Sequence, residues 1–555
     1  MNRYSNKNLS SGFWKWGDPA KAFHLNDFPR FKSFLEEKWK RKLNDDFKAP
    51  DITQLIPEST FSENDFSKTF PNLKQEQFSN SKESRILYGF GKSCHDIIRI
   101  FSGKIPPLPD FVLFPESEDE VEHILQNASK NKIRLIPFSG GSNVTGAFEL
   151  NEKNVSCVVN LQRMKRMVAI DETSHTATFE TGIFGPELEK ILNAKGFTLG
   201  HFPQSFEYSA LGGWLATRSG GQESGQYGKI EDMVLGIRAI TPNGIIDTKD
   251  FPKHASGIDT FRLFIGSEGT LGIITQAKLR IHKLQSEQKW IVALFKTFDE
   301  GAEAVRCLLQ QGIHPGILRL SDPLETKLFS TMRNSESGGL KKLIGALIKS
   351  RLASKGFNEP CILMTRFSIR NDSDFAMTKF TCRFFKSHNG FILPSSTAGN
   401  WEEHRFTLPY LRDTLIEHRV MIDTFETIAY WKNTSALYLN VKESLKKSAF
   451  YDKGGLLFCH LSHVYETGAC LYFTMIAPME RSNEEAQWMN YKTLVTDAII
   501  ESGGAVSHHH GVGKDHQPWY LKTIDAGEKE LLQAVKKHLD PNGIMNPGKL
   551  FDPEN

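Results

Sequence analysis

Residues 211–221 read LGGWLATRSGG, and HFPQS at 201–205 and YGKIED at 227–232 flank them. Two other glycine-rich stretches are PFSGGSNV at 137–144 and GSEGTLGIIT at 266–275. Glycine lets a backbone approach a bound group closely, and successive free N–H groups form a nest for anionic oxygen atoms. One such stretch is a weak signal, because any tight turn looks similar. The three together predict a region whose backbone packs closely against another group.

The length and composition are those of a multidomain enzyme. The chain has 555 residues, which is more than one hydrophobic core serves, so two or three domains are expected. A formal net charge of +3 argues against nucleic acid as a partner. Seven cysteines without paired spacing argue against a disulfide framework and favour a reducing compartment.

Targeting signals are not recognised in the sequence. The start lacks the pattern of a secretory signal, no apolar run reaches the length of about 18 residues that spans a bilayer, and the last residues are no peroxisomal signal. The expected location is cytoplasmic, with membrane association left open.

The chain is expected to divide into four segments. Residues 1–105 have helical periodicity and predict a helical N-terminal lobe, whereas residues 106–286 alternate strand-like runs such as RLIPF with helices and predict an α+β domain. Residues 287–500 join strands such as ACLYFTMIA to the helical DEGAEAVRCLLQQG, which predicts an antiparallel sheet with helices on one face. Residues 501–555 hold SHHHGVGK and a last helix.

The three glycine-rich stretches resemble the FAD-binding domain of the vanillyl-alcohol-oxidase flavoprotein superfamily. In that family the first stretch wraps the pyrophosphate, GGW runs along the flavin, and GSEGTLG closes the site. The resemblance implies a two-lobed PCMH-type FAD-binding domain beside a substrate-binding cap domain, with the segment 501–555 returning to the flavin site. Ser139 stands where a glycine is usual, and no Rossmann GxGxxG or P-loop is present. The resemblance assigns FAD binding to Pro137, Ser139, Gly140, Gly141, Ser142, Asn143, Val144, Pro203, Gln204, Ser205, Gly212, Gly213, Trp214, Thr217, Arg218, Ser219, Gly220, Glu268, Gly269, Thr270, Gly272 and Ile273.

The C-terminal half narrows the resemblance to one branch of the superfamily. TGACLYF at 467–473 and SHHHGVGK at 507–514, together with ILRLSD at 317–322 and YLRDTLIEHRVMIDTFET at 410–427, resemble the alkyldihydroxyacetonephosphate synthase family. The resemblance covers most of the chain beyond residue 85. It implies non-covalent FAD and an exchange of the acyl group of acyl-dihydroxyacetone phosphate for a fatty alcohol. That exchange forms an ether bond without net redox change, as a step of ether-lipid synthesis.

The same resemblance assigns roles to individual residues. A histidine and a phenol suit proton transfer, and an arginine suits a departing carboxylate. The residues placed at the family's catalytic positions are Tyr472, His510, Arg412 and His201, and those placed at the substrate phosphate are His508, His509 and Lys514. Arg319 also matches the family, but the sequence does not separate a structural ion pair from a role in the site.

Interpretations without a catalytic role stay open for these residues. Tyr472 alternates with apolar residues and could be a core tyrosine, and Arg412 could pair with Asp413. The SHHHGVGK loop could be solvated or could bind a metal with His460 and His463. No metal is expected, because the Asp and Asn of the metal-dependent relatives are missing. Two other functions remain: an FAD-linked 2-hydroxy-acid dehydrogenase and a flavin-binding protein without catalysis.

A basic amphipathic element is predicted at 339–352. Leucine and isoleucine share one helical face there, and lysine and arginine flank it, which is the pattern of a helix at a membrane interface. A core-facing helix with a solvated basic side is the alternative. A homodimer is a further expectation.

Overall fold

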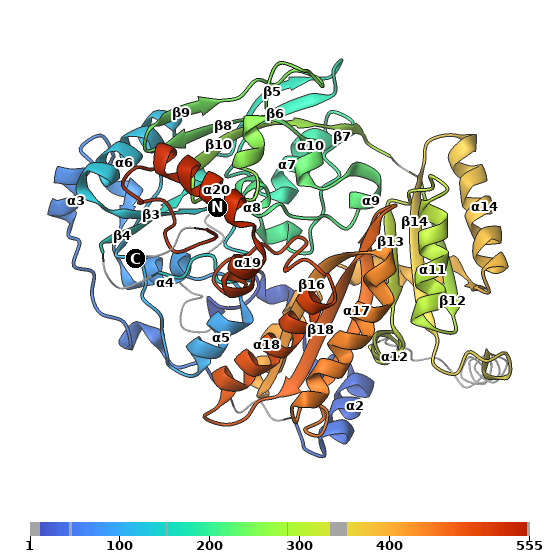
Figure 1. Cartoon of the computed structure of the whole chain (residues 1–555). Helices are drawn as coiled ribbons and strands as arrows, with labels where there is room; N and C mark the ends of the chain where they lie inside the picture. Colours follow the sequence, from blue (N-terminus) through green and yellow to red (C-terminus); the bar gives the residue numbers. More distant parts are fainter. Residues whose placement is uncertain (1–11, 44–46, 151–153, 286, 333–351, 552–555) are drawn as a thin grey trace.

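The computed structural model describes residues 12–43, 47–150, 154–285, 287–332 and 352–551. It is an α+β protein with two bodies beside each other (Figure 1). The predicted fold class is confirmed: the first body has a four-stranded and a five-stranded sheet with a small two-stranded sheet of β7 (Phe197–Thr198) and β11 (His282–Lys283), and the second is built on one large antiparallel sheet.

The first body has two lobes, each with its own sheet. One sheet has the order β1-β2-β4-β3, in which β4 runs parallel to both β2 and β3. The other is antiparallel and has the order β5-β6-β10-β8-β9. The strands are β1 (Phe78–Ser79), β2 (Phe111–Leu113), β3 (Arg134–Phe138), β4 (Ser156–Asn160), β5 (Met167–Asp171), β6 (Thr176–Glu180), β8 (Val234–Thr241), β9 (Gly244–Asp247) and β10 (Ile273–Arg280).

The helices of this body begin and end where local sequence predicts. Ser117 caps the helix α6 (Glu118–Asn131) by accepting the Glu120 N–H, and three acidic residues fill its first turn. Val121, Ile124 and Leu125 on its inner face are fully buried. The short helix α8 (Leu211–Thr217) carries the GGW segment and ends at Arg218 in a left-handed conformation.

The second body is a seven-stranded sheet of order β15-β12-β14-β13-β17-β18-β16, antiparallel throughout. Its strands are β12 (Glu287–Phe295), β13 (Ile317–Ser321), β14 (Cys361–Ile369), β15 (Phe391–Leu393), β16 (Val420–Tyr430), β17 (Leu456–Val464) and β18 (Gly468–Pro478). Four helices lie along one face of this sheet (Figure 1), namely α11 (Phe298–Leu309), α14 (Asp372–Ser387), α17 (Trp431–Ser444) and α18 (Glu484–Glu501).

The prediction of helices on only one face of this sheet was wrong. Alternate residues of a strand face opposite ways, so Met475 packs with the four helices while its neighbour Ile476 faces a separate apolar cluster. That cluster includes side chains of α2 (Pro29–Trp39), α12 (Pro323–Thr331) and α16 (Pro409–Glu417). The second face is therefore partly covered by short helices that come from distant parts of the sequence.

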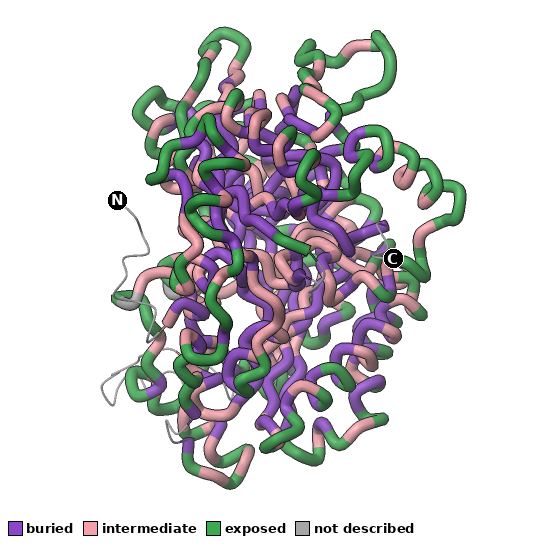
Figure 2. The backbone as a smooth tube through the Cα atoms, turned by 90° about the vertical axis from the view of Figure 1, so that its left-hand side faces the viewer, coloured by how far each residue is buried: buried purple, intermediate pink, exposed green. Residues whose placement is uncertain are grey.

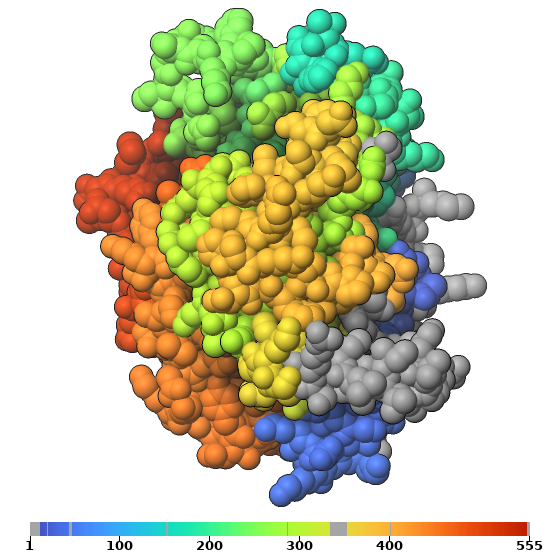
Figure 3. Space-filling view, turned by 90° about the vertical axis from the view of Figure 1, so that its right-hand side faces the viewer, coloured from blue at the N-terminus to red at the C-terminus, as the bar shows by residue number. Residues whose placement is uncertain are grey.

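The N-terminal helices share their cores with both bodies. Phe31 and Leu35 of α2 pack into the cluster on the second face of the large sheet, and Ile97 of α5 (Cys94–Phe101) packs on its helical side. Phe66 and Phe70 belong to the core of the first body. Figure 3 shows the blue α2 region lying directly against the yellow and orange second body.

The C-terminal segment crosses back from the second body to the first. After α18 the chain passes through residues 507–514 and continues into α19 (Gln517–Thr523) and α20 (Ala526–Leu539). Leu539 and Leu550 join the core of the five-stranded sheet, and Met545 bridges to Leu135 of β3. Buried segments run through the centre of the molecule, where the two bodies meet, and exposed loops form its rim (Figure 2).

Candidate active site

A cavity of about 360 Å³ lies between the two bodies. Its first wall is made by the three glycine-rich stretches, and its second by β13, β16, β17 and β18 with α12 and α16. The N-terminal segment also reaches it, through Trp16, Phe31, Lys92 and Cys94. Residues that are far apart in the sequence thus enclose one continuous space.

Most residues predicted to bind FAD line the first wall. Two predicted residues lie outside it: Thr270 is fully buried and donates a hydrogen bond to the Ser267 carbonyl, and Arg218 pairs with Glu231 at 3.2 Å. The predicted residues on the wall are Pro137, Ser139, Gly140, Gly141, Ser142, Asn143, Val144, Pro203, Gln204, Ser205, Gly212, Gly213, Trp214, Thr217, Ser219, Gly220, Glu268, Gly269, Gly272 and Ile273.

The first wall has the donors that a pyrophosphate needs. The backbone N–H groups of residues 140–144 face no acceptor among the described residues, although these residues line the cavity. A side chain at Gly140 would meet the Tyr208 carbonyl at 2.7 Å, so the loop packs tightly from behind. Asn546 Oδ1, an acceptor, is buried without a described partner and could accept an N–H group of a bound cofactor. Successive unpaired N–H groups suit a phosphate-bearing cofactor, and FAD fits this wall.

The segment 507–514, here called the histidine loop, is anchored by two buried carboxylates. Glu426 of β16 accepts the Ser507 hydroxyl at 2.6 Å and the backbone N–H groups of His508, His509 and His510 at 2.6, 3.2 and 3.0 Å. Glu268 of the first body accepts the N–H groups of Val512 and Gly513 at 2.5 and 2.9 Å. One loop is therefore fastened to both bodies.

Glu426 is ionised, which suits its role as the anchor of the histidine loop. Burial opposes its ionisation, but His510 and His508, the Ser507 hydroxyl and a backbone N–H group favour the carboxylate, and together they lower its pKa to about 2. Lys229 adds a further anchor by donating to the His508 carbonyl at 2.8 Å.

Tyr472 and His510 meet at the second wall. Their ring centroids lie 5.6 Å apart, nearly perpendicular, and both residues line the cavity. Burial raises the pKa of the Tyr472 phenol and lowers that of His510. A phenol that keeps its proton and an imidazole that stays neutral are a matched donor and acceptor for proton transfer.

Tyr472 is also stacked on His460, at 4.8 Å between ring centroids. Arg319 Nη1 lies 3.1 Å from Nε2 of His460 and can only donate there, so Nε2 accepts and Nδ1 carries the proton. Nδ1 then donates to Glu325 at 3.0 Å. Arg319 and His460 both line the cavity, so Arg319 belongs to the site as well as to an ion pair.

Arg412 lines the cavity, but its guanidinium is already engaged. It donates to the Lys92 carbonyl at 2.5 Å and to Asp413 at 2.9 Å, and it lies over the Trp16 ring. The pair with Asp413 that the sequence left open is present. Arg412 thereby ties the N-terminal segment to α16 at the edge of the cavity.

Three other predicted site residues lie behind the cavity wall. His201 is fully buried and its Nε2 lies 2.6 Å from the hydroxyl of Ser219, which does line the cavity. His508 contacts His509 and Tyr465, and Lys514 is absent from the lining. The structure therefore brings Tyr472, His509, His510 and Arg412 together at the cavity and keeps His201, His508 and Lys514 one layer away.

Sequence reasoning missed two buried charged groups at or beside the cavity, Glu426 and Lys92. Glu426 shows as a charged residue within the apolar run MIDTFETIAY, a signal that was available. Lys92 gave no such signal, because its neighbours come together only in the fold. It is buried, its Nζ donates to the Phe13 carbonyl at 2.7 Å, and burial with nearby Arg412 lowers its pKa to about 7.

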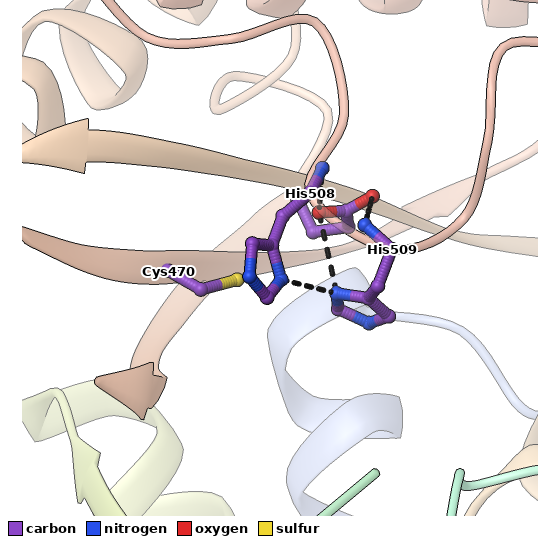
Figure 4. Close-up of side chains that lie close together, drawn as sticks. Cys470, His508 and His509 are labelled. Atoms are coloured by element: carbon purple, nitrogen blue, oxygen red, sulfur yellow. Dashed lines mark hydrogen bonds and ion pairs between the residues drawn. The ribbon is translucent and has the colours of Figure 1, made fainter. Parts of the chain in front are cut away.

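One group of side chains bears on the question of metal binding. Glu426, Cys470, His508 and His509 bring one ligand-type atom each within 4.8 Å of one another (Figure 4). The two histidine Nδ1 atoms already face each other at 3.0 Å as hydrogen-bond partners, and both Glu426 oxygens accept donors of the histidine loop. The expectation of no metal stays a prediction.

Comparisons with known proteins agree with this arrangement. Residues 109–249 match a family model described as an FAD binding domain, and residues 284–550 match FAD linked oxidases, C-terminal domain. FAD is accordingly the cofactor of this protein.

Similar sequences and structures place the chain within one family of FAD-dependent enzymes. An alkyldihydroxyacetonephosphate synthase of Dictyostelium discoideum is 36% identical over 86% of this chain and 79% of its own, and one of Trypanosoma brucei brucei is 33% identical over the same shares. A solved alkyldihydroxyacetonephosphate synthase structure superposes with a TM-score of 0.85 at 30% identity, covering 99% of this chain and 100% of that one. Sequence, site and fold agree that this chain belongs to the alkyldihydroxyacetonephosphate synthase family of FAD-dependent enzymes.

Proposed function

We propose that this protein is an alkylglycerone-phosphate synthase. It exchanges the acyl group of 1-acyl-dihydroxyacetone phosphate for a long-chain fatty alcohol and so forms the ether bond of ether lipids. The observation that carries the proposal is that one continuous cavity joins a wall suited to FAD, the Tyr472–His510 pair and an apolar arm.

The apolar arm is suited to a long alkyl chain. It runs along the second face of the large sheet, where an aliphatic chain would bury its surface against side chains instead of water. The side chains that form it are Phe31, Leu328, Phe329, Met332, Leu411, Ile422, Phe458 and Ile476.

The residues of the chain supply proton transfer and charge. Bound FAD, held non-covalently, supplies the group that stabilises the electron-poor carbon next to the ketone while its oxygen substituent is exchanged. Neutral His510 accepts the hydroxyl proton of the alcohol at its ring, and the protonated Tyr472 phenol donates a hydrogen bond to the leaving oxygen. Arg319 and Arg412 supply positive charge for the leaving carboxylate and the substrate phosphate, and His509 also lines the cavity.

Labelled substrates test the function directly. Purified protein mixed with palmitoyl-dihydroxyacetone phosphate and labelled hexadecanol is expected to release palmitate and to form a labelled alkyl-dihydroxyacetone phosphate, without an external electron acceptor. Mass spectrometry of the products and the flavin absorbance are the measurements. Net bleaching of the flavin by a 2-hydroxy acid, with no ether product, would instead support a dehydrogenase. A flavin inert to every substrate would support a non-catalytic flavoprotein.

Membrane contact is proposed on the sequence of residues 339–352. All but the last of these lie outside the described residues, and none of the described helices is long and apolar enough to cross a membrane. A basic amphipathic element would bring the enzyme to its lipid substrates at a bilayer surface. Deletion of residues 340–352 is expected to weaken sedimentation with anionic liposomes, and equal sedimentation would contradict the proposal.

The organisation of the chain is proposed as the sequence predicts it: an N-terminal lobe (1–105), an FAD-binding domain (106–286), a cap domain (287–500) and a returning C-terminal segment (501–555). A cytoplasmic location and a homodimer are part of the same proposal, and light scattering of the purified protein tests the dimer.

A further inference from the structure

The proposed reaction releases one proton in each turnover. The alcohol loses its hydroxyl proton as its oxygen bonds to carbon, and the acyloxy group leaves with the electron pair of the broken carbon–oxygen bond. The leaving group is a carboxylate at neutral pH, because carboxylic acids have pKa values of about 4. The proton must therefore pass from a buried cavity to solvent, and this need rests on the proposed function.

A chain of hydrogen-bonded rings leads away from the cavity. His509 lines the cavity, and its Nδ1 lies 3.0 Å from Nδ1 of His508. On the other side of the His508 ring, Nε2 lies 2.8 Å from the hydroxyl of Tyr465. Tyr465 follows directly after β17 and is only partly buried. Figure 4 shows the rings of His508 and His509 facing each other, with Cys470 beside His508.

We propose that His509, His508 and Tyr465 form a relay that carries the released proton from the cavity toward the surface, which the chain reaches at the exposed Glu466 and Thr467 directly after Tyr465. His509, whose ring centroid lies 4.6 Å from that of His510, takes up at its cavity-side nitrogen the proton that His510 has accepted, and passes the proton on its Nδ1 to Nδ1 of His508. His508 passes its Nε2 proton to the Tyr465 oxygen, and Tyr465 gives its own hydroxyl proton to water. Each group ends with as many protons as it began with. The two imidazole rings then return to their starting tautomers by proton exchange.

The surroundings hold the relay in position. Glu426 fixes the backbone of His508 and His509, and Tyr465 is pinned by hydrogen bonds from its N–H to the Gly468 carbonyl at 2.8 Å and from the Trp431 indole to its own carbonyl at 3.0 Å. Fixed donors and acceptors at these distances are what proton transfer between side chains requires.

The charge states of the members also suit a relay. Burial and the neighbouring histidines keep the pKa values of His508 and His509 well below the ordinary value, so both rings are neutral and each has one donor and one acceptor nitrogen. Burial, the Cys470 thiol and the carboxylates of Glu231 and Asp232 raise the pKa of Tyr465, so its hydroxyl stays protonated between transfers.

Tyr465→Phe tests the relay, because it removes the hydroxyl and keeps the ring. The rate of ether formation is expected to fall about tenfold or more, the solvent deuterium isotope effect to rise, and the KM for hexadecanol to stay within about twofold. Added imidazole is expected to restore part of the rate by accepting the proton from His508. The matched control is Tyr451→Phe, whose hydroxyl donates to the Lys442 carbonyl away from the cavity and whose loss should change none of these quantities.

Several results would overturn the relay. A Tyr465→Phe enzyme with the wild-type rate and isotope effect would do so, and so would a slower enzyme that imidazole does not rescue, which indicates a structural role. If this variant fails to retain FAD, His508→Gln gives the same test, since an amide keeps hydrogen bonds but does not relay protons. A divalent ion bound one to one between His508 and His509 would also exclude it. A wild-type enzyme that forms no ether would instead refute the proposed function.

Discussion

Tyr472→Phe is expected to lower the rate of ether formation by about 10²–10⁴-fold while FAD stays bound. The hydroxyl is the only group that the substitution removes, and the ring keeps its stacking on His460 and its contact with His510. Because burial holds the phenol in its protonated form, it is suited to donate a hydrogen bond to the departing carboxylate oxygen. Steady-state rates with labelled hexadecanol, measured beside the flavin spectrum, give the result.

The thermal midpoint separates this role from simple packing. Loss of the hydroxyl donor should lower turnover and leave the thermal midpoint close to the wild-type value, whereas a packing defect should lower both. Tyr438→Phe provides a contrast, because its buried hydroxyl donates to Asp322 outside the cavity and its loss should cost stability more than activity. A Tyr472→Phe enzyme with wild-type turnover would remove Tyr472 from the mechanism.

Glu426→Gln is expected to lower both stability and activity. In the wild type the backbone N–H groups donate to the carboxylate, whereas the glutamine amide would place an N–H donor opposite them. A buried group left without a hydrogen-bond partner costs about 1–3 kcal/mol. The free energy of unfolding should fall by about 2–5 kcal/mol, and activity by about 10²-fold or more, because the anchor of His509 and His510 is lost. Denaturant titration and turnover measure the two effects.

The pH dependence of stability has a defined sign here. The folded pKa of Glu426 is about 2, below its ordinary value of 4.5. A carboxylate whose pKa is lower in the folded than in the unfolded protein stabilises the fold. This stabilisation is complete above the pKa of the unfolded protein and is lost as the pH falls through the pKa of the folded protein. Wild type should therefore lose stability between about pH 4.5 and 2, and this contribution should be missing in Glu426→Gln.

Glu189→Gln is the matched control for the buried carboxylate. Glu189 accepts the backbone N–H groups of Leu199 and Gly200 in the same way but lies outside the cavity wall. Its loss should not change turnover. Equal loss of activity in both variants would mean that Glu426 acts through general stability and not through the histidine loop.

Local sequence identified most elements of the fold because their signals are local. Ser117 and the acidic residues after it mark the start of α6, and the alternation of ACLYFTMIA marks β18. The opposite face of the large sheet shows the limit. Its covering helices α2, α12 and α16 are short and distant in sequence, so periodicity gave no sign that they meet there.

By itself the sequence determined the cofactor and the family, because glycine-rich stretches and the SHHHGVGK loop carry their chemistry in consecutive residues. The tertiary structure alone decided which side chains face the cavity and which stand behind it. His508 and His509 are neighbours in sequence, yet one lines the cavity and the other points toward Tyr465. Only packing could set that difference, since it depends on Glu426 and Glu268, two buried carboxylates from separate bodies that fix the backbone of one loop.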